Sequence, residues 1–284
     1  MRLLTVGNPV LDVAPSGLRP GGTAVYATAT VRALGLPAAW VGAIATHDLP
    51  LFGALAEGAT VAPIASTVRF QNTYTPLGRE QRVQGRPAPL LPEIVAAAFR
   101  PGDLVLVGPI LGEAPPATVA VLPERHIAGI CLQGYLRTVA AGGLVVPRDS
   151  NRGLPDLPCA HLATCFLSTE DLPCWPLERT VRDLLGRYAR VVVTNGPHGA
   201  TCYHARGSRF VPAFPTVERD PTGAGDVFAA AFCIRLAETG DDDEALAFAA
   251  TAASFAVEGE GTSSLAGRDA IEARRASHVE VAVE

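Results

Sequence analysis

The sequence contains no lysine, and all 23 of its basic side chains are arginines. A Walker-A phosphate loop, the ATP-binding lysine of a protein kinase and a Schiff-base enzyme each require a lysine ammonium group at a fixed position. These three kinds of site are therefore excluded. Any phosphate group that the protein binds must be held by backbone amides, arginine or a metal ion.

The six cysteines include no C-x-x-C pair, and in a cytoplasmic chain such cysteines are expected to be reduced. Cys159, His161, Cys165 and Cys174 lie close together, and three or four ligands of these types can hold zinc. Their spacing fits none of the usual structural zinc patterns. Whether this cluster has a role is left open.

No apolar run approaches the roughly 18 residues of a membrane helix, and no signal peptide is visible after Met1. The net charge of −5 argues against a nucleic-acid surface, which is normally basic. We therefore expect a cytoplasmic protein that binds neither membranes nor nucleic acid. The hydrophobic content of 48% is ample for a buried core.

Apolar runs of strand length alternate with segments of helix length along the chain. Strands are expected at residues 3–6, 39–44, 104–107, 127–132, 162–167 and 191–194, and helices at 23–34, 93–99, 177–188, 224–236 and 243–257. Continuous apolar strands separated by helices favour a mostly parallel sheet that is covered on both faces. We therefore expect an α/β fold and, because no long linker interrupts the chain, one domain over residues 1–284.

Outside this pattern, residues 68–75 and 80–84 predict a hairpin, because Pro76 and Gly78 suit a type I turn between them. Most arginines are expected to be solvated, which is the commoner case for this residue. Arg79, Arg82 and Arg137 are interpreted in this way, with contact to substrate or phosphate as the alternative. Arg274 and Arg275 are expected in a polar tail without a specific role.

The most distinctive motif is residues 220–226, Asp-Pro-Thr-Gly-Ala-Gly-Asp, which an apolar helix follows directly. Its two glycines let the backbone turn tightly and approach a ligand closely. The helix must be buried, because it is apolar on every face, and the amides of Gly223, Ala224 and Gly225 at its start suit an anion. Asp226 could accept a proton from an attacking hydroxyl group there. The alternative is that Asp226 only caps the helix.

Residues 220–226 resemble the C-terminal signature of the PfkB (ribokinase-like) carbohydrate kinases, and weaker similarities follow in order along nearly the whole chain. Residues 21–26 are similar to the Gly-Gly substrate motif of that family. Asp12 stands where such kinases keep a carboxylate that holds sugar hydroxyls. The nucleotide side of the family is matched by residues 193–200 and by Gly261 with Thr262, and its Mg²⁺ region by residues 168–171.

The resemblance implies a ribokinase-like three-layer sandwich with a mostly parallel central sheet and a reduced β lid. It implies transfer of the γ-phosphate of ATP, with Mg²⁺, to a hydroxyl of a small sugar or polyol. Asp226 would be the base, and the amides of residues 223–225 would bind the developing negative charge. The other implied residues are Asp12, Gly21, Gly22, Tyr26 and Gln133 for the substrate, Thr194, Gly196, Gly199, Thr222 and Gly261 for the nucleotide, Glu170 for Mg²⁺ through water, and Asp220 for a monovalent cation such as K⁺.

The sequence also departs from the family pattern. Thr23 and Tyr26 stand where the substrate motif usually has Lys and Asn, which disfavours ribose-type contacts. Only eight residues separate Asp12 from Gly21, so part of the lid is expected to be missing, and the hairpin within residues 68–84 would be its remnant. Three segments look more like the inositol-kinase-like branch, namely residues 72–79, 108–113 and 133–137.

We therefore predict a cyclic polyol such as an inositol as the preferred small-molecule substrate. A nucleoside kinase of the same fold is the first alternative. A catalytically silent sensor of nucleotide or sugar is the second. The shortened lid leaves both a monomer and a homodimer open.

Overall fold

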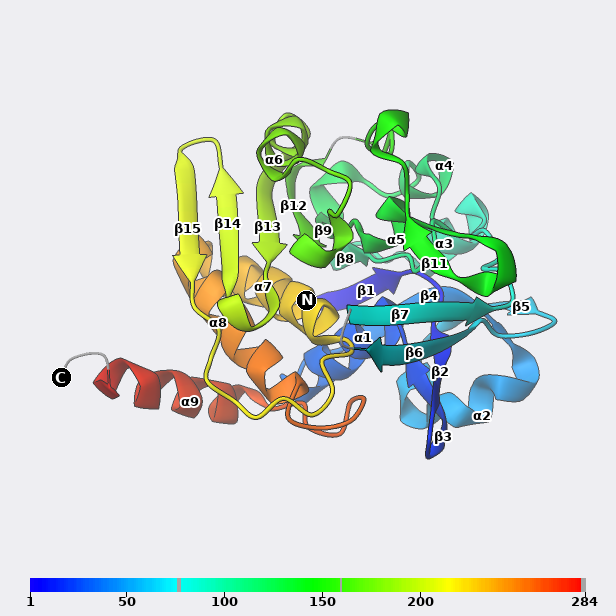
Figure 1. Ribbon diagram of the computed structural model, residues 1–284, viewed down its shortest axis with the longest axis horizontal. Helices are drawn as coiled ribbons and strands as arrows, with labels where there is room; N and C mark the ends of the chain where they lie inside the picture. The colour runs from blue at the N-terminus through cyan, green and yellow to red at the C-terminus, as the bar shows by residue number, and fades with distance from the viewer. Residues whose placement is uncertain (76–77, 159, 282–284) are drawn as a thin grey trace.

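A nine-stranded sheet forms the centre of the computed structural model, which describes residues 1–75, 78–158 and 160–281 (Figure 1). The strand order is β15 (Gly207–Val211), β14 (Ala200–His204), β13 (Tyr188–Thr194), β12 (Ala160–Ser168), β9 (Ile127–Cys131), β8 (Asp103–Val107), β1 (Arg2–Val6), β4 (Ala38–Ala45) and β5 (Thr60–Ile64). The strands from β13 to β5 are parallel, and β14 and β15 are antiparallel. The predicted mostly parallel sheet is confirmed.

Helices cover both faces of this sheet, which makes a three-layer sandwich (Figure 1). One face packs against α3 (Pro92–Ala98), α4 (Pro116–Val119) and α6 (Leu177–Leu185), and the other against α1 (Thr23–Ala33), α7 (Ala224–Thr239) and α8 (Asp242–Ala256). Successive side chains of β1 alternate between the two cores, as strand geometry requires: Leu4 and Val6 enter the first and Leu3 the second. Burying one such side chain contributes about 1.5–3 kcal/mol.

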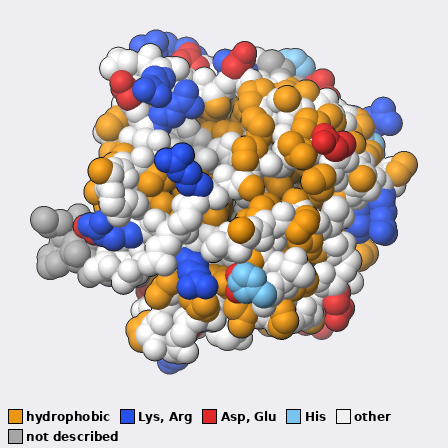
Figure 2. All heavy atoms as spheres, turned by 90° about the vertical axis from the view of Figure 1, so that its right-hand side faces the viewer, with side chains coloured by type: hydrophobic (Ala, Val, Ile, Leu, Met, Phe, Trp, Pro, Cys, Tyr) orange, Lys and Arg blue, Asp and Glu red, His pale blue; other side chains and the backbone are white. Residues whose placement is uncertain are grey.

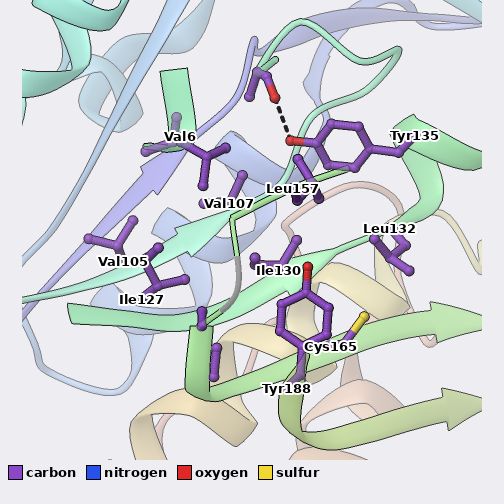
Figure 3. Close-up of a cluster of buried hydrophobic side chains, with 14 of the residues drawn as sticks. Val6, Val105, Val107, Ile127, Ile130, Leu132, Tyr135, Leu157, Cys165 and Tyr188 are labelled. Atoms are coloured by element: carbon purple, nitrogen blue, oxygen red, sulfur yellow. Dashed lines mark hydrogen bonds between the residues drawn. The ribbon is translucent and has the colours of Figure 1, made fainter. Parts of the chain in front are cut away.

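Figure 3 shows part of the first core, where side chains of β1, β8 and β9 pack together. Tyr135, in α5 (Gln133–Leu136), closes this core near the ends of the strands. Its hydroxyl donates a hydrogen bond to the carbonyl oxygen of Ala114 at 2.6 Å, so the buried polar atom is satisfied. The core therefore anchors the loops that follow β8 and β9.

A second sheet of four strands lies at the edge of the sandwich, and we call it the lid sheet. Its order is β3 (Gly17–Gly21), β2 (Val10–Ala14), β6 (Arg69–Thr75) and β7 (Gly78–Gln84). The expected hairpin is present as β6 and β7, while its predicted turn at Pro76 lies outside the described residues. The hairpin does not stand alone, because a turn at residues 15–16 lets two five-residue strands fit between residues 10 and 21.

The C-terminal segment forms α9 (Arg268–Val281), which packs on α8. Arg274 donates a hydrogen bond to Glu258 at 3.0 Å, and its guanidinium lies 3.3 Å from the centre of the Phe255 ring. Arg275 donates to Glu244 at 2.9 Å. These guanidinium groups lower the pKa of Glu244 and of Glu258. The expectation that Arg274 and Arg275 have no specific role was wrong, because both bind carboxylates of α8 or of the turn after it.

The remaining elements are α2 (Leu49–Phe52), β10 (Arg137–Val139), β11 (Val145–Pro147) and several 3-10 helices of three or four residues. On the face drawn in Figure 2, apolar side chains gather over the middle and arginine side chains are scattered around them. Within the described ranges, none of the helices has the length and apolar character needed to cross a bilayer.

Candidate active site

One cavity of about 580 Å³ lies where the parallel strands of the central sheet end and the lid sheet begins. Loops after four of these strands contribute to its wall, at Ile110, Gln133, Glu170 and Gly196. In open α/β sheets, ligands bind at this carboxyl end of the strands. The start of α7 closes the cavity between the two sheets.

Most of the residues predicted from the sequence line this one cavity. They are Asp12, Gly22, Tyr26, Gln133, Glu170, Thr194, Gly196, Gly199, Thr222, Gly223, Ala224, Gly225 and Asp226. Gly21, Asp220 and Gly261 do not line it. A second cavity, of about 650 Å³, shares Arg137 with the first and contains none of the predicted residues.

The backbone turns sharply into α7 at Gly223, which has a φ of 82° in the left-handed region. A Cβ atom on Gly223 would also lie 2.4 Å from the ring of Tyr26. Glycine is therefore required there both by the backbone angle and by the lack of space for a side chain. The amide of Ala224 donates to the carbonyl oxygen of Pro221 at 3.3 Å. Of the three amides expected to bind an anion, that of Ala224 is therefore engaged in the turn. Gly225 is exposed and has open space where a side chain would lie.

Asp226 occupies the first turn of α7 and lines the cavity. The Thr23 hydroxyl donates to Asp226 Oδ1 at 2.6 Å and so holds the carboxylate in one orientation. Thr23 itself rests on Gly108, where a Cβ would lie 2.2 Å from the Thr23 methyl group. From the sequence, Thr23 is recognisable only as a departure from the family motif, because nothing local indicates a contact between residues 203 positions apart.

The half of the cavity next to the lid sheet is rich in hydrogen-bonding side chains. We call it the acceptor half, after the phosphate acceptor that the family resemblance implies. Asp12, Asn72, Gln81, Gln133 and Arg137 line it. Gly21 stands behind Asp12, since a Cβ there would lie 2.1 Å from Asp12 Oδ2. Gly21 is thus needed to make room for the carboxylate.

Arg137 does not lie on a solvated surface as expected. Its Nε donates to the carbonyl oxygen of Ile110 and its Nη1 to Gln81 Oε1, both at 2.8 Å. The guanidinium also lies 5.5 Å from the centre of the Phe70 ring. The expectation was wrong because these three partners are distant in sequence, and β10 brings Arg137 to them.

Tyr26 was expected to bind the substrate. Its side chain is 2% exposed and packs beneath Gly223. Burial raises the pKa of Tyr26, and the negative charges of Asp12, Asp220 and Asp226 raise it further. The phenol therefore stays neutral. Tyr26 lies among these three carboxylates, and its ring supports the turn into α7.

The other half of the cavity, which we call the donor half, is mostly apolar. The predicted residues Thr194, Gly196 and Gly199 line it together with a wall that contains Pro197, Phe214, Ala250, Ala253 and Val257. Gly199 is required by its φ of 96° and because a Cβ would lie 2.2 Å from the carbonyl oxygen of Val211. Gly261, expected beside the nucleotide, lies in a turn outside this wall.

Glu170 was expected to bind Mg²⁺ through water, and its exposed side chain lines the cavity. Its neighbour Asp171 accepts the Ser168 amide at 2.9 Å in a capping box, so Asp171 has a structural role. Mg²⁺ commonly keeps several waters and takes one or two carboxylates together with phosphate oxygens. Glu170, whose carboxylate lines the cavity, fits that requirement.

No group of three or more metal-ligating side chains gathers anywhere in the described part of the chain. Cys159 lies outside that part, Cys165 is buried in β12 and Cys174 is exposed. Burial raises the pKa of Cys165.

Asp220 was expected to bind a monovalent cation. Its Oδ1 accepts the Thr222 amide at 3.0 Å, and its Oδ2 lies 3.6 Å from the guanidinium of Arg19. Arg19 is in β3 and also pairs with Glu260 at 2.8 Å. A positive charge therefore already stands beside Asp220, and a role in K⁺ binding stays a prediction.

Replacing Gly223 with alanine is expected to lower the free energy of unfolding more than the same change at Gly240, the C-cap residue of α7. Both glycines have a positive φ, which costs about 1–2 kcal/mol for alanine. Only at Gly223 does the new methyl group also collide with a buried ring, which adds about 1–3 kcal/mol. Urea unfolding of both variants tests this, and equal losses would contradict the packing of Tyr26 against the turn.

Part of the chain is similar in sequence to known carbohydrate kinases. The profile described as "pfkB family carbohydrate kinase" matches residues 178–267, which include the start of α7. A ribokinase from Bacillus subtilis is 42% identical over 83 residues, or 28% of each chain. An inositol 3-kinase from Zea mays is 39% identical over 128 residues, which is 41% of this chain and 31% of the relative. The chain thus spans less than a third of the length of these relatives.

Solved structures resemble nearly the whole chain. A pyrophosphate-dependent myo-inositol-1 kinase, converted by mutation into a myo-inositol-3 kinase, has a TM-score of 0.75 and 18% identity over 97% of this chain and 99% of its own. An E. coli protein described as a ribokinase II, in complex with ATP and Mg²⁺, has a TM-score of 0.68 and 19% identity over 98% of this chain and 99% of its own. At such identities the likeness shows the fold alone.

The family profile covers the segment that carries residues 220–226, and the fold likeness extends over 97% of the chain. Residues 178–267 therefore match the PfkB family of carbohydrate kinases, and the chain has the ribokinase fold.

Proposed function

We propose that the chain is a kinase that transfers the γ-phosphate of ATP to a hydroxyl group of a small sugar or polyol. The observation that carries this proposal is the position of Asp226. It stands at the start of α7, where the polar acceptor half of the cavity meets the apolar donor half. A base and an anion-binding helix end at that junction suit transfer between two bound molecules.

The proposed reaction follows from the positions of the Asp226 carboxylate and of the amides at the start of α7. Phosphoryl transfer has a loose transition state, so catalysis depends mainly on positioning and on neutralising charge. The acceptor hydroxyl loses its proton to Asp226, whose carboxylate the Thr23 hydroxyl orients. A weak base suffices, because the proton leaves late, when the oxygen is already bonding to phosphorus. The amides at the start of α7, chiefly those of Gly223 and Gly225, take the negative charge of the transferred group.

The donor half supports ATP in preference to pyrophosphate, although three of the solved structures of similar fold are of kinases described as pyrophosphate-dependent. Phe214, Pro197 and Val257 make an apolar wall beside the anion site. Pyrophosphate would leave this wall uncovered, whereas an adenine ring would cover it. When bound with the phosphates, Mg²⁺ would neutralise their charge, and Glu170 is the side chain placed to hold it through water.

The acceptor half supports a polyhydroxylated acceptor. Asp12 can accept hydrogen bonds from two neighbouring hydroxyl groups, and the side chains of Gln133 and Arg137 can donate to others. We favour an inositol-like cyclic polyol, because this cluster includes residues of the segments that resemble inositol kinases. A nucleoside kinase is the alternative, and a silent sensor would have no use for an oriented base at residue 226.

An ADP-release assay that compares inositols, ribose, fructose and nucleosides at equal concentration is expected to give the highest kcat/KM with an inositol. A site built to pair with each acceptor hydroxyl discriminates strongly against acceptors that leave its polar groups unpaired. A higher kcat/KM for ribose or a nucleoside would contradict the inositol preference and leave the kinase proposal standing. Absence of ADP release with every acceptor would contradict the kinase proposal itself.

A further inference from the structure

Glu113 is a buried carboxylate that the chemistry proposed above does not use. Its side chain is 2% exposed, and no arginine or histidine of the described chain forms an ion pair with it. Backbone amides bind it instead: Asn8 (2.9 Å) and Ile110 (2.8 Å) donate to Oε1, and Ile110 (3.0 Å) and Leu111 (2.9 Å) to Oε2. Burial raises the pKa of Glu113, and these N–H donors oppose that shift. Burying a carboxylate is costly, so its presence here calls for a reason beyond packing.

The three amides belong to two loops that meet under the acceptor half. Asn8 lies between β1 and β2, the strand that carries Asp12, and residues 110 and 111 follow β8. β1 and β8 are neighbours in the central sheet. Their loops touch so closely that a Cβ on Gly7 would lie 2.2 Å from the carbonyl oxygen of Gly108. Glu113 therefore ties together the loops after two adjacent strands.

The loop after β8 in turn supports three parts of the site. Thr23, which orients the base, rests on Gly108. The start of α5 rests on the next residues, since a Cβ on Gly134 would lie 2.0 Å from a carbonyl oxygen of this loop. The carbonyl oxygen of Ile110 accepts the hydrogen bond of Arg137 Nε at 2.8 Å. A shift of this loop would therefore move several acceptor-half side chains at once.

We infer that Glu113 is a positioning residue for the acceptor: it holds the loops after β1 and β8 in the arrangement that places Asp12, Gln133 and Arg137 around the substrate. This inference rests on the proposed function and concerns one half of the cavity. The donor half follows β12, β13 and α8, and none of these described segments hydrogen-bonds to Glu113.

The test is Glu113→Gln, which keeps the shape of the side chain but turns an NH₂ group toward amide donors. Its KM for the best acceptor of the panel above is expected to rise about 10-fold or more, with the KM for ATP changed less than about 2-fold, because small misplacements of a substrate-binding group are costly. The matched control is Asp103→Asn, at the opposite end of β8. Asp103 is 3% exposed and accepts hydrogen bonds from Arg2 and from the Arg100 amide, each at 2.8 Å. Asp103→Asn is expected to lower Tm and to leave both KM values unchanged.

An unchanged acceptor KM in Glu113→Gln would overturn the inference, as would an equal rise in both KM values or the same acceptor effect in Asp103→Asn. Amide hydrogen exchange provides a readout that does not depend on activity. If the wild-type protein phosphorylates no acceptor, the proposed function fails, and exchange still tests Glu113. Faster exchange in peptides containing residues 8 and 110–111, in Glu113→Gln alone, supports the positioning role, and exchange equal to that of the wild type overturns it.

Discussion

Asp226→Asn is expected to reduce turnover by about 100-fold or more, the usual scale for the loss of a general base. Asparagine keeps the size of the side chain and can still accept the hydrogen bond that Thr23 donates at 2.6 Å. It cannot take up the acceptor proton. Steady-state rates with saturating acceptor and ATP measure the loss, and calorimetry is expected to show ATP affinity nearly unchanged.

An acidic side chain at the start of a helix can stabilise that helix without taking part in catalysis. A second variant is therefore needed as a control. Asp243 lies in the first turn of α8 and is the matched residue. Asp243→Asn removes the same kind of charge from a helix start that does not line the cavity. It is expected to leave turnover within about 2-fold of the wild type, because surface charges of this kind affect stability only slightly. Near-wild-type turnover of Asp226→Asn would contradict the role of Asp226 as base.

Gly225→Val is expected to abolish most ATP binding while the protein stays folded. Apart from its chain neighbours and the backbone of α7 itself, no described atom lies within 4 Å of the place where a side chain on Gly225 would begin. The backbone there is helical, so valine brings little strain at this position. Its methyl groups would occupy the space in front of the first-turn amides, where the phosphate group is proposed to bind. The expected loss is about 100-fold or more in ATP affinity, on the scale of a lost charge-assisted hydrogen-bond site.

Gly225→Ala provides the graded control for this prediction. One methyl group blocks less of the space than an isopropyl group, so its ATP affinity is expected to lie between those of the wild type and Gly225→Val. Titration calorimetry measures the affinities, and thermal unfolding checks that all three proteins are equally folded. Unchanged ATP binding in a folded Gly225→Val protein would show that the phosphates bind elsewhere.

The parts of the site that could be predicted from the sequence are those whose residues are adjacent in the chain. Residues 223–226 combine a turn, a helix start and a carboxylate within four positions, and a buried apolar helix follows them. Sequence patterns of this kind depend on backbone preferences that need no knowledge of distant contacts. Most of the central sheet was predictable for the same reason, because six of its seven parallel strands contain a continuous apolar run. The seventh, β5, was missed because it is partly exposed and contains Thr60 and Pro63.

The parts that could not be predicted depend on contacts between distant segments. Thr23 meets Asp226, and Glu113 meets Asn8, only once α1, β1 and β8 have packed. Arg137 looked like an ordinary surface arginine until β10 placed it against the lid sheet. The strands β2 and β3 were missed because β3, Gly-Leu-Arg-Pro-Gly, is not an apolar run and forms a strand only by pairing with β2.

The most direct test of the central claim is ³¹P NMR of the purified protein with ATP, Mg²⁺ and an inositol. If the protein is the proposed kinase, we expect the γ-phosphate resonance of ATP to decline while the resonances of ADP and of a new phosphate monoester grow together. The Asp226→Asn variant is predicted to form this monoester about 100-fold more slowly or not at all. Conversion of ATP to inorganic phosphate without a phosphate monoester, across all the sugars and polyols of the panel, would contradict the claim.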